Sequence, residues 1–157
     1  MLRKVMLFFV CLIICCLPVL ASVFILPEAL TGWYSLLIKP PFIAPDWVFG
    51  PVWTLLYILL ATVLFIVMRA KIPAKEKRYP LMLFFAQLLL SMIWPPVFFA
   101  MQYFFLGFCI IALMVALNAD FIRSVSKKMP LAAYLMYPYI MWLCYAGYLN
   151  GGVYILN

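Results

Sequence analysis

The chain has 157 residues, of which 71% are hydrophobic and only 10% are charged, and its formal net charge is +7. Soluble domains are about half apolar and about a quarter charged, because their surface must be covered with polar groups. The composition therefore excludes soluble, disordered and disulfide-scaffold classes, and it predicts an all-α integral membrane protein with a single membrane domain over residues 1–157.

Charged residues divide the chain into four charge-free blocks, at 5–27, 47–68, 79–119 and 129–157. A helix crosses the roughly 30 Å hydrocarbon core with about 20 residues, so the first, second and last blocks supply one span each. The third block is long enough for two spans joined near Gln102. The sequence therefore predicts a five-transmembrane-helix bundle, with helices at approximately 5–26, 47–68, 79–100, 104–122 and 130–152.

The first block follows Arg3 and Lys4, as the apolar region of a secretory signal peptide would. Its apolar stretch is longer than the roughly 7–15 residues of a signal peptide, and Leu20-Ala21-Ser22 is a poor cleavage signal. We therefore expect this block to remain in the protein as a transmembrane helix.

Five spans would place the N-terminus, the 69–78 loop and the 120–128 loop on one side of the membrane. That side would hold ten cations: Arg3, Lys4, Arg69, Lys71, Lys75, Lys77, Arg78, Arg123, Lys127 and Lys128. The other side would hold only Lys39. The positive-inside rule then predicts a cytoplasmic N-terminus and an outside C-terminus. We expect the membrane to be a bacterial cell membrane. Topology and lipid contacts account for the positive charge without a nucleic-acid partner.

Conventional catalytic groups are scarce. There is no histidine, and the carboxylates are Glu28, Asp46, Glu76 and Asp120. The five cysteines form no CxxC pair and lie in apolar blocks, which indicates packing rather than a metal or redox site. No ionisable residue falls at membrane depth, which disfavours ion-coupled transport. We expect no metal, no required cofactor and no conventional acid–base site.

Aromatic and neutral polar side chains recur at helical spacing within the predicted spans. The stripes are Trp53 and Tyr57, then Gln87, Ser91 and Trp94, and then Trp142, Tyr145 and Leu149. Helix packing explains any one stripe, but three stripes around one bundle favour a shared pocket for a large, flat, apolar ligand.

Three further features carry alternatives that the sequence leaves open. The proline-rich loop at 27–46 either covers a cavity mouth or forms an interfacial aromatic belt. Gly147-x-x-x-Gly151 serves either a dimer contact or packing within the bundle. Pro95-Pro96 should kink or break its helix, because proline lacks the backbone donor and clashes with the preceding turn.

Several motifs together resemble the translocator protein family (TspO/MBR, the peripheral-type benzodiazepine receptors). They are Trp33-Tyr34-x-x-Leu37-x-Lys39-Pro40, Pro45-x-Trp47-Val48-Phe49-x-Pro51-Val52-Trp53-x-x-x-Tyr57, Gln87-Leu88, Trp94-Pro95-Pro96-Val97-Phe98-Phe99, Tyr137-Pro138-Tyr139-x-x-Trp142 and Leu149-Asn150. The resemblance covers the first loop and the second to fifth predicted helices in order.

The resemblance implies a homodimeric five-helix bundle that binds porphyrins and, in animal members, cholesterol and synthetic drugs. It implies a membrane protein that binds a tetrapyrrole (protoporphyrin IX or haem), with transport or light-dependent porphyrin degradation as its activity. The ligand-binding candidates that match by position are Trp33, Phe49, Trp53, Tyr57, Ser91, Trp94, Tyr137, Trp142, Ala146 and Leu149. Trp53 and Trp142 are the candidate photochemical residues.

Some positions depart from the family pattern. Ala44 replaces a proline, Phe42 stands where a tryptophan is usual, and Ser91 replaces an asparagine. Leu106 occupies a position that is tryptophan in animal members. The sterol-contact pattern is missing from the C-terminal region, which makes sterol binding the weakest inheritance. Two alternatives stay open: an uncoupled small-molecule exporter, and a regulatory membrane protein that acts through partners.

Overall fold

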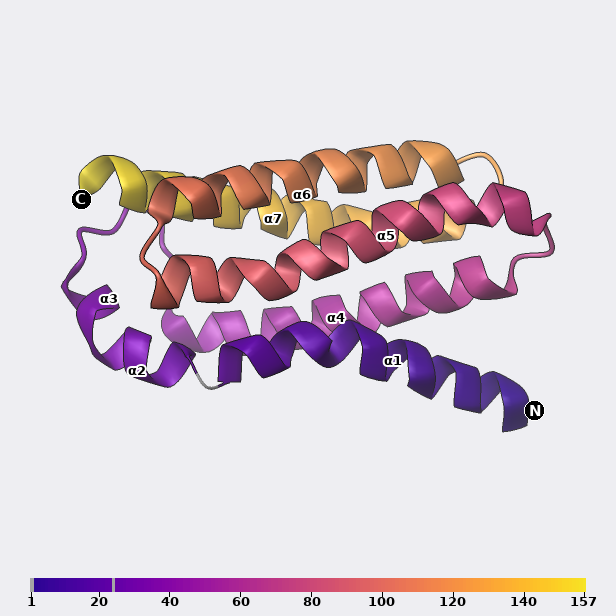
Figure 1. Cartoon of the computed structure of the whole chain (residues 1–157), viewed down its shortest axis with the longest axis horizontal. Helices are drawn as coiled ribbons and strands as arrows, with labels where there is room; N and C mark the ends of the chain where they lie inside the picture. The colour runs from indigo at the N-terminus through magenta and orange to yellow at the C-terminus, as the bar shows by residue number, and fades with distance from the viewer. Residues whose placement is uncertain (1, 24) are drawn as a thin grey trace.

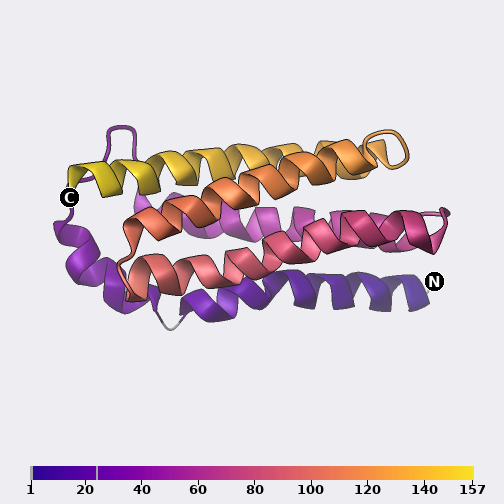
Figure 2. The ribbon, with the colours of Figure 1, turned by 45° about the horizontal axis from the view of Figure 1, so that its top comes forward.

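The computed structural model describes residues 2–23 and 25–157, and this part of the chain is helical, with short connections and no strand. The helices are α1 (Leu2–Val23), α2 (Leu26–Thr31), α3 (Trp33–Leu36), α4 (Asp46–Arg69), α5 (Ala74–Pro95), η1 (Pro96–Ala100), α6 (Phe104–Val125) and α7 (Pro130–Leu156). The five long helices lie side by side along one axis (Figures 1 and 2). The predicted all-α class is confirmed.

Four helical segments in the described residues are long and apolar enough to cross a membrane: Leu2–Leu20, Asp46–Arg69, Ala74–Ala100 and Phe104–Val125. These spans are those of an integral membrane protein. α7 is 27 residues long, as long as the longest of these segments, and contains no charged side chain. Its tyrosines, prolines and Asn150 make it less apolar than the other four long segments.

Proline sets several of the helix boundaries. Pro45 and Pro73 directly precede α4 and α5, and Pro130 is the first residue of α7, where a missing backbone N–H costs no helical bond. At Pro95-Pro96 two successive donors are missing from the ladder. The chain responds by widening into the π-helix η1, in which the N–H of Met101 donates to the carbonyl of Pro96 at 2.9 Å.

The close packing of α6 on α7 depends on small residues. A Cβ added at Gly147 would lie 3.3 Å from Ile111, and one added at Gly151 would lie 3.2 Å from Phe108. Both neighbouring side chains belong to α6. The Gly147-x-x-x-Gly151 pattern is therefore used for packing within the chain.

The two ends of the bundle differ in charge and in structure. Figure 1 shows the N-terminus at the same end as the α4–α5 and α6–α7 connections, with α2, α3 and the C-terminus at the other end. The first end carries the ten cations named above, and it is tied together by an ion pair between Lys128 and Glu76 and by a hydrogen bond from Tyr79 to Asp120. The second end, which holds the short helices, contains the cavity described next.

Candidate functional site

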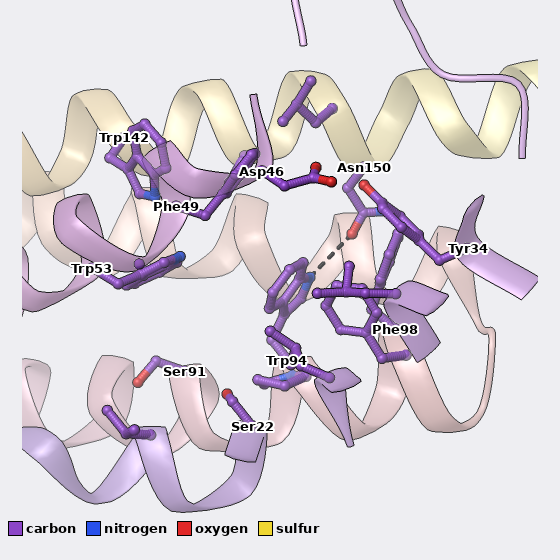
Figure 3. Close-up of a pocket in the computed structure, with 18 of the residues that line it drawn as sticks. Ser22, Tyr34, Asp46, Phe49, Trp53, Ser91, Trp94, Phe98, Trp142 and Asn150 are labelled. Atoms are coloured by element: carbon purple, nitrogen blue, oxygen red, sulfur yellow. Dashed lines mark hydrogen bonds between the residues drawn. The ribbon is translucent and has the colours of Figure 1, made fainter. Parts of the chain in front are cut away.

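A cavity of about 370 Å³ lies between α1, α4, α5, η1 and α7, at the end of the bundle that carries α2 and α3 (Figure 3). Its size is within the range of small-molecule sites, about 300–1,000 Å³. Most of its lining is apolar or aromatic, and three of the chain's five tryptophans, Trp53, Trp94 and Trp142, contribute to it.

One wall of the cavity is a run of aromatic rings from α4 and α7. Trp53 stacks on Tyr57 with ring centroids 5.6 Å apart, and its other neighbour, Trp142, meets it edge-on at 6.5 Å. Phe49 also meets Trp142 edge-on, at 5.6 Å. Phe49, Trp53 and Tyr57 are three and four residues apart, so they share one face of α4. This wall offers flat, polarisable surface to a ligand.

The other wall comes from the end of α5, from η1 and from α7. Trp94 stacks on Phe98 with centroids 5.4 Å apart, and its indole N–H donates to Oδ1 of Asn150 at 3.1 Å. The Asn150 side-chain amide in turn donates to the carbonyl of Phe104 at 2.8 Å. The hydrogen bonds fix the orientation of both side chains, so this wall is rigid before any ligand arrives.

Few polar groups are left over for a ligand. The Ser91 hydroxyl is buried and already donates to the carbonyl of Leu88 at 2.7 Å. The indole N–H of Trp142 is buried and has no acceptor among the described residues. At the mouth, burial raises the pKa of the Tyr34 hydroxyl, and the negative charge of Asp46 raises it further. The site thus offers the buried, unpaired indole N–H of Trp142 inside and a carboxylate at its mouth.

The loop before α4 is held against the C-terminal half of α7. The Tyr145 hydroxyl donates to the carbonyl of Phe42 at 3.0 Å and accepts from the N–H of Ala44 at 2.7 Å. The Tyr148 hydroxyl donates to the carbonyl of Pro41 at 2.6 Å. Asn157 exchanges two hydrogen bonds, both of 3.0 Å, with the backbone of Ile38.

The 27–46 loop was expected either to cover a cavity mouth or to form an interfacial aromatic belt, and the structure shows features of both. Its first part contributes Leu30 and Tyr34 to the cavity lining, and its last residue, Asp46, lies at the mouth. The stretch between them is fixed on α7 and exposes the large apolar side chains of Leu36 and Phe42. The two ends of the segment thus serve the cavity, and its middle presents an apolar surface of the kind expected at a membrane interface.

Eight of the ten residues predicted from the sequence line the cavity: Phe49, Trp53, Tyr57, Ser91, Trp94, Trp142, Ala146 and Leu149. The structure places the other two elsewhere. Trp33 packs against Phe98 and Phe104, behind the cavity wall. Tyr137 is exposed on α7, with its ring beside Tyr134. It lies five residues before Trp142, and at about 100° per residue its side chain leaves the helix from a different face.

Sequence reasoning also missed part of the lining: Val19, Ser22, Leu26, Leu30, Tyr34, Asp46, Gly50, Thr54, Pro95, Phe98, Phe99, Asn150 and Val153. Helical spacing could have found Asp46, which lies three residues before Phe49 and seven before Trp53. Phe98, Phe99 and Asn150 were already within the quoted motifs. The lining residues of α1 and α2 had no signal beyond hydropathy.

Apolar spans packed around an aromatic cavity define a helical integral membrane protein with a site for a small molecule. Comparison with known proteins identifies the family: the model of the TspO/MBR family matches residues 8–156. The chain therefore belongs to the TspO/MBR family, and the resemblance drawn from its motifs is confirmed.

Relatives with established names come from bacteria, archaea and animals. The Tryptophan-rich protein TspO of Chlorobaculum tepidum is 35% identical over 134 residues, which cover 83% of each chain. The protein of the same name from Archaeoglobus fulgidus is 36% identical over 146 residues, 87% of this chain and 88% of the relative. The Translocator protein of Homo sapiens is 36% identical over 121 residues, 75% of this chain and 70% of the relative.

Proposed function

We propose that this protein is a membrane receptor or carrier for a tetrapyrrole such as protoporphyrin IX or haem, held in the aromatic cavity. The observation that carries the proposal is the pair of facing walls, with Trp53, Tyr57 and Trp142 on one side and Trp94 and Phe98 on the other. A flat macrocycle has the shape and the apolar faces that such walls stack on. The Trp142 indole N–H supplies a donor for an acceptor atom of the ligand.

Light-dependent breakdown of the bound porphyrin is a second candidate activity, and the aromatic wall favours it. Trp53 contacts both Trp142 and Tyr57, so three oxidisable rings are in sequence along the cavity. Indole donates an electron more readily than phenyl rings do, and a photoexcited porphyrin is a strong acceptor; dissolved dioxygen is the co-reactant, and it supplies the oxidant for cleavage of the ring. Such a reaction needs no acid–base residue.

We propose further that α7 is the fifth membrane span, with the N-terminus in the cytoplasm. α7 packs alongside α6 and α4 over the length of the bundle, and the basic residues gather at one end (Figure 1). Reporter fusions within 69–78 and after Asn157 test this topology. The proposal requires the two reporters to lie on opposite sides of the membrane, and reporters on the same side would contradict it. The homodimer that the resemblance implies stays a prediction.

Titration of purified protein with protoporphyrin IX, followed by quenching of tryptophan fluorescence, tests the binding proposal. Saturable quenching at one porphyrin per chain is expected, because the cavity tryptophans would contact the ligand. Passage of porphyrin through protein-loaded liposomes without saturable quenching would instead support the uncoupled exporter.

A further inference from the structure

Asp46 is the only side chain with a formal charge in the described lining of the cavity. It is the first residue of α4, directly after the N-cap Pro45, and its carboxylate accepts no hydrogen bond from the described residues. It also forms no ion pair within residues 2–23 and 25–157. In Figure 3 the carboxylate points across the mouth of the cavity, toward Tyr34 and Asn150. Asp46 is thus a negative charge at the ligand entrance that has no cationic side-chain partner among the described residues.

The surroundings of this carboxylate are of the kind that binds cations. Three aromatic residues line the cavity together with Asp46: Phe49, Trp53 and Trp142. The faces of their rings carry negative electrostatic potential. Aromatic rings with a nearby carboxylate are a common arrangement for holding organic ammonium groups. Neither the faces of these rings nor Asp46 offers a favourable electrostatic partner to a ligand carboxylate at the mouth; the unpaired donor of Trp142 lies deeper in the cavity.

The charged side chains near the cavity do not cancel the preference of its mouth for a cationic group. Glu28, on the exposed face of α2, adds a second negative charge at the same end of the bundle. Lys39 is the one cation there among the described residues, and its ammonium lies 4.7 Å from the centroid of the Tyr34 ring, outside the cavity lining. The other ten cations belong to the opposite end. Within a chain of charge +7, the cavity end is therefore net negative in its side chains.

We infer that Asp46 makes the cavity selective for ligand charge: it favours a flat aromatic ligand with a cationic group at the mouth over the same ring with carboxylates. The inference deepens the proposed function and rests on it, because it specifies which tetrapyrrole derivatives the cavity accepts. The two propionates of protoporphyrin IX would either face Asp46, where like charges repel, or have to turn away from it. Amide or amine derivatives of the same ring would face it without repulsion.

Three porphyrins with one ring test the inference: protoporphyrin IX, its dimethyl ester and its diamide with terminal amines. Their affinities are measured by fluorescence quenching at low ionic strength, in nanodiscs of zwitterionic lipid. Wild type should bind the amine derivative most tightly and the dicarboxylate most weakly. Asp46→Asn should shift the ratio of these two affinities by about threefold or more, as expected for a partly exposed charge pair, and leave the ester unchanged.

Glu28→Gln is the matched control, since it removes the same charge at the same end, outside the cavity lining. It should leave the affinity ratio within about twofold of wild type. An unchanged ratio in Asp46→Asn, or an equal shift in both variants, would overturn the inference.

A second pair of probes separates this inference from the proposed function. An aminoacridine cation and an acridine carboxylate share one small flat ring, and their affinity ratio should respond to Asp46→Asn in the same direction. Absence of binding by all three porphyrins, with the acridine ratio still dependent on Asp46, would refute the tetrapyrrole proposal and support charge selection. Porphyrin binding that does not depend on Asp46 would support the tetrapyrrole proposal and refute charge selection.

Discussion

The indole N–H of Trp94 donates to Oδ1 of Asn150 at 3.1 Å, and this bond joins the end of α5 to α7 beside the cavity. Gly107 of α6 makes room for it. A Cβ at Gly107 would lie 2.8 Å from Oδ1 of Asn150 and 3.3 Å from the ring of Phe98. The cavity wall therefore depends on a glycine that does not line the cavity itself.

Gly107→Ala should destabilise the protein by about 1–3 kcal/mol, because the new methyl group displaces the amide of Asn150 and leaves buried polar groups unpaired. Gly50→Ala is the control, since nothing lies within 4 Å of its added Cβ. Thermal unfolding in detergent, followed by near-ultraviolet circular dichroism, measures the difference. Equal midpoints for the two variants would show that the Trp94–Asn150 bond does not need the space at Gly107.

Tyr148→Phe should loosen the loop before α4, because it removes the hydrogen bond from the hydroxyl to the carbonyl of Pro41. Backbone amides at 37–45 should exchange with solvent deuterium several-fold faster, as expected for a loss of about 1 kcal/mol. Tyr154→Phe is the matched control on the same helix, since its hydroxyl has no hydrogen bond among the described residues. Equal exchange rates in both variants would mean that Tyr148 does not anchor the loop.

Trp142→Ala should weaken porphyrin binding roughly threefold to tenfold, since an aromatic contact contributes about 0.5–1.5 kcal/mol beyond area burial. Lys75→Ala, at the opposite end of the bundle, should leave the affinity nearly unchanged. Fluorescence titration of both variants gives the comparison. If their affinities are the same, Trp142 does not contact the ligand.

Trp53→Phe should keep most of the porphyrin affinity and slow the loss of porphyrin under illumination. Phenylalanine preserves a flat apolar surface but donates an electron far less readily than indole. The measurement is the decay of porphyrin absorbance in light, with a dark control, in wild type, Trp53→Phe and Trp142→Phe. Decay at the wild-type rate in both variants, or equal decay in the dark, would leave the tryptophans as cavity walls only.

The helical architecture could be predicted from the sequence because single charged residues and prolines mark where the long apolar helices begin and end. Pro45 and Pro73, for example, lie directly before α4 and α5. The π-helix after Pro95 was harder to foresee. Loss of two donors indicates a disturbed helix, but whether it kinks, breaks or widens depends on how Phe98 and Phe99 pack in the cavity end of the core.

The lining residues of the cavity could be predicted where they share one face of a single helix. They were harder to predict where several elements meet. Trp53 and Tyr57 follow from spacing along α4, and both line the cavity. Trp33 lies in the expected loop, but its ring turns toward Phe104, a contact between segments about seventy residues apart that no local pattern encodes. Asp46 was overlooked because it was treated only as a charge that ends a span.

Filling the cavity tests the central claim most directly. Ala146 lines the cavity, so Ala146→Phe should occupy the space between the two aromatic walls. Ala116 is exposed on α6, and Ala116→Phe adds the same side chain on the outside of the bundle. Saturable quenching by protoporphyrin IX should be lost in Ala146→Phe and kept in Ala116→Phe, with both variants folded by circular dichroism. Wild-type affinity in a folded Ala146→Phe variant would show that the ligand binds elsewhere and would contradict the account.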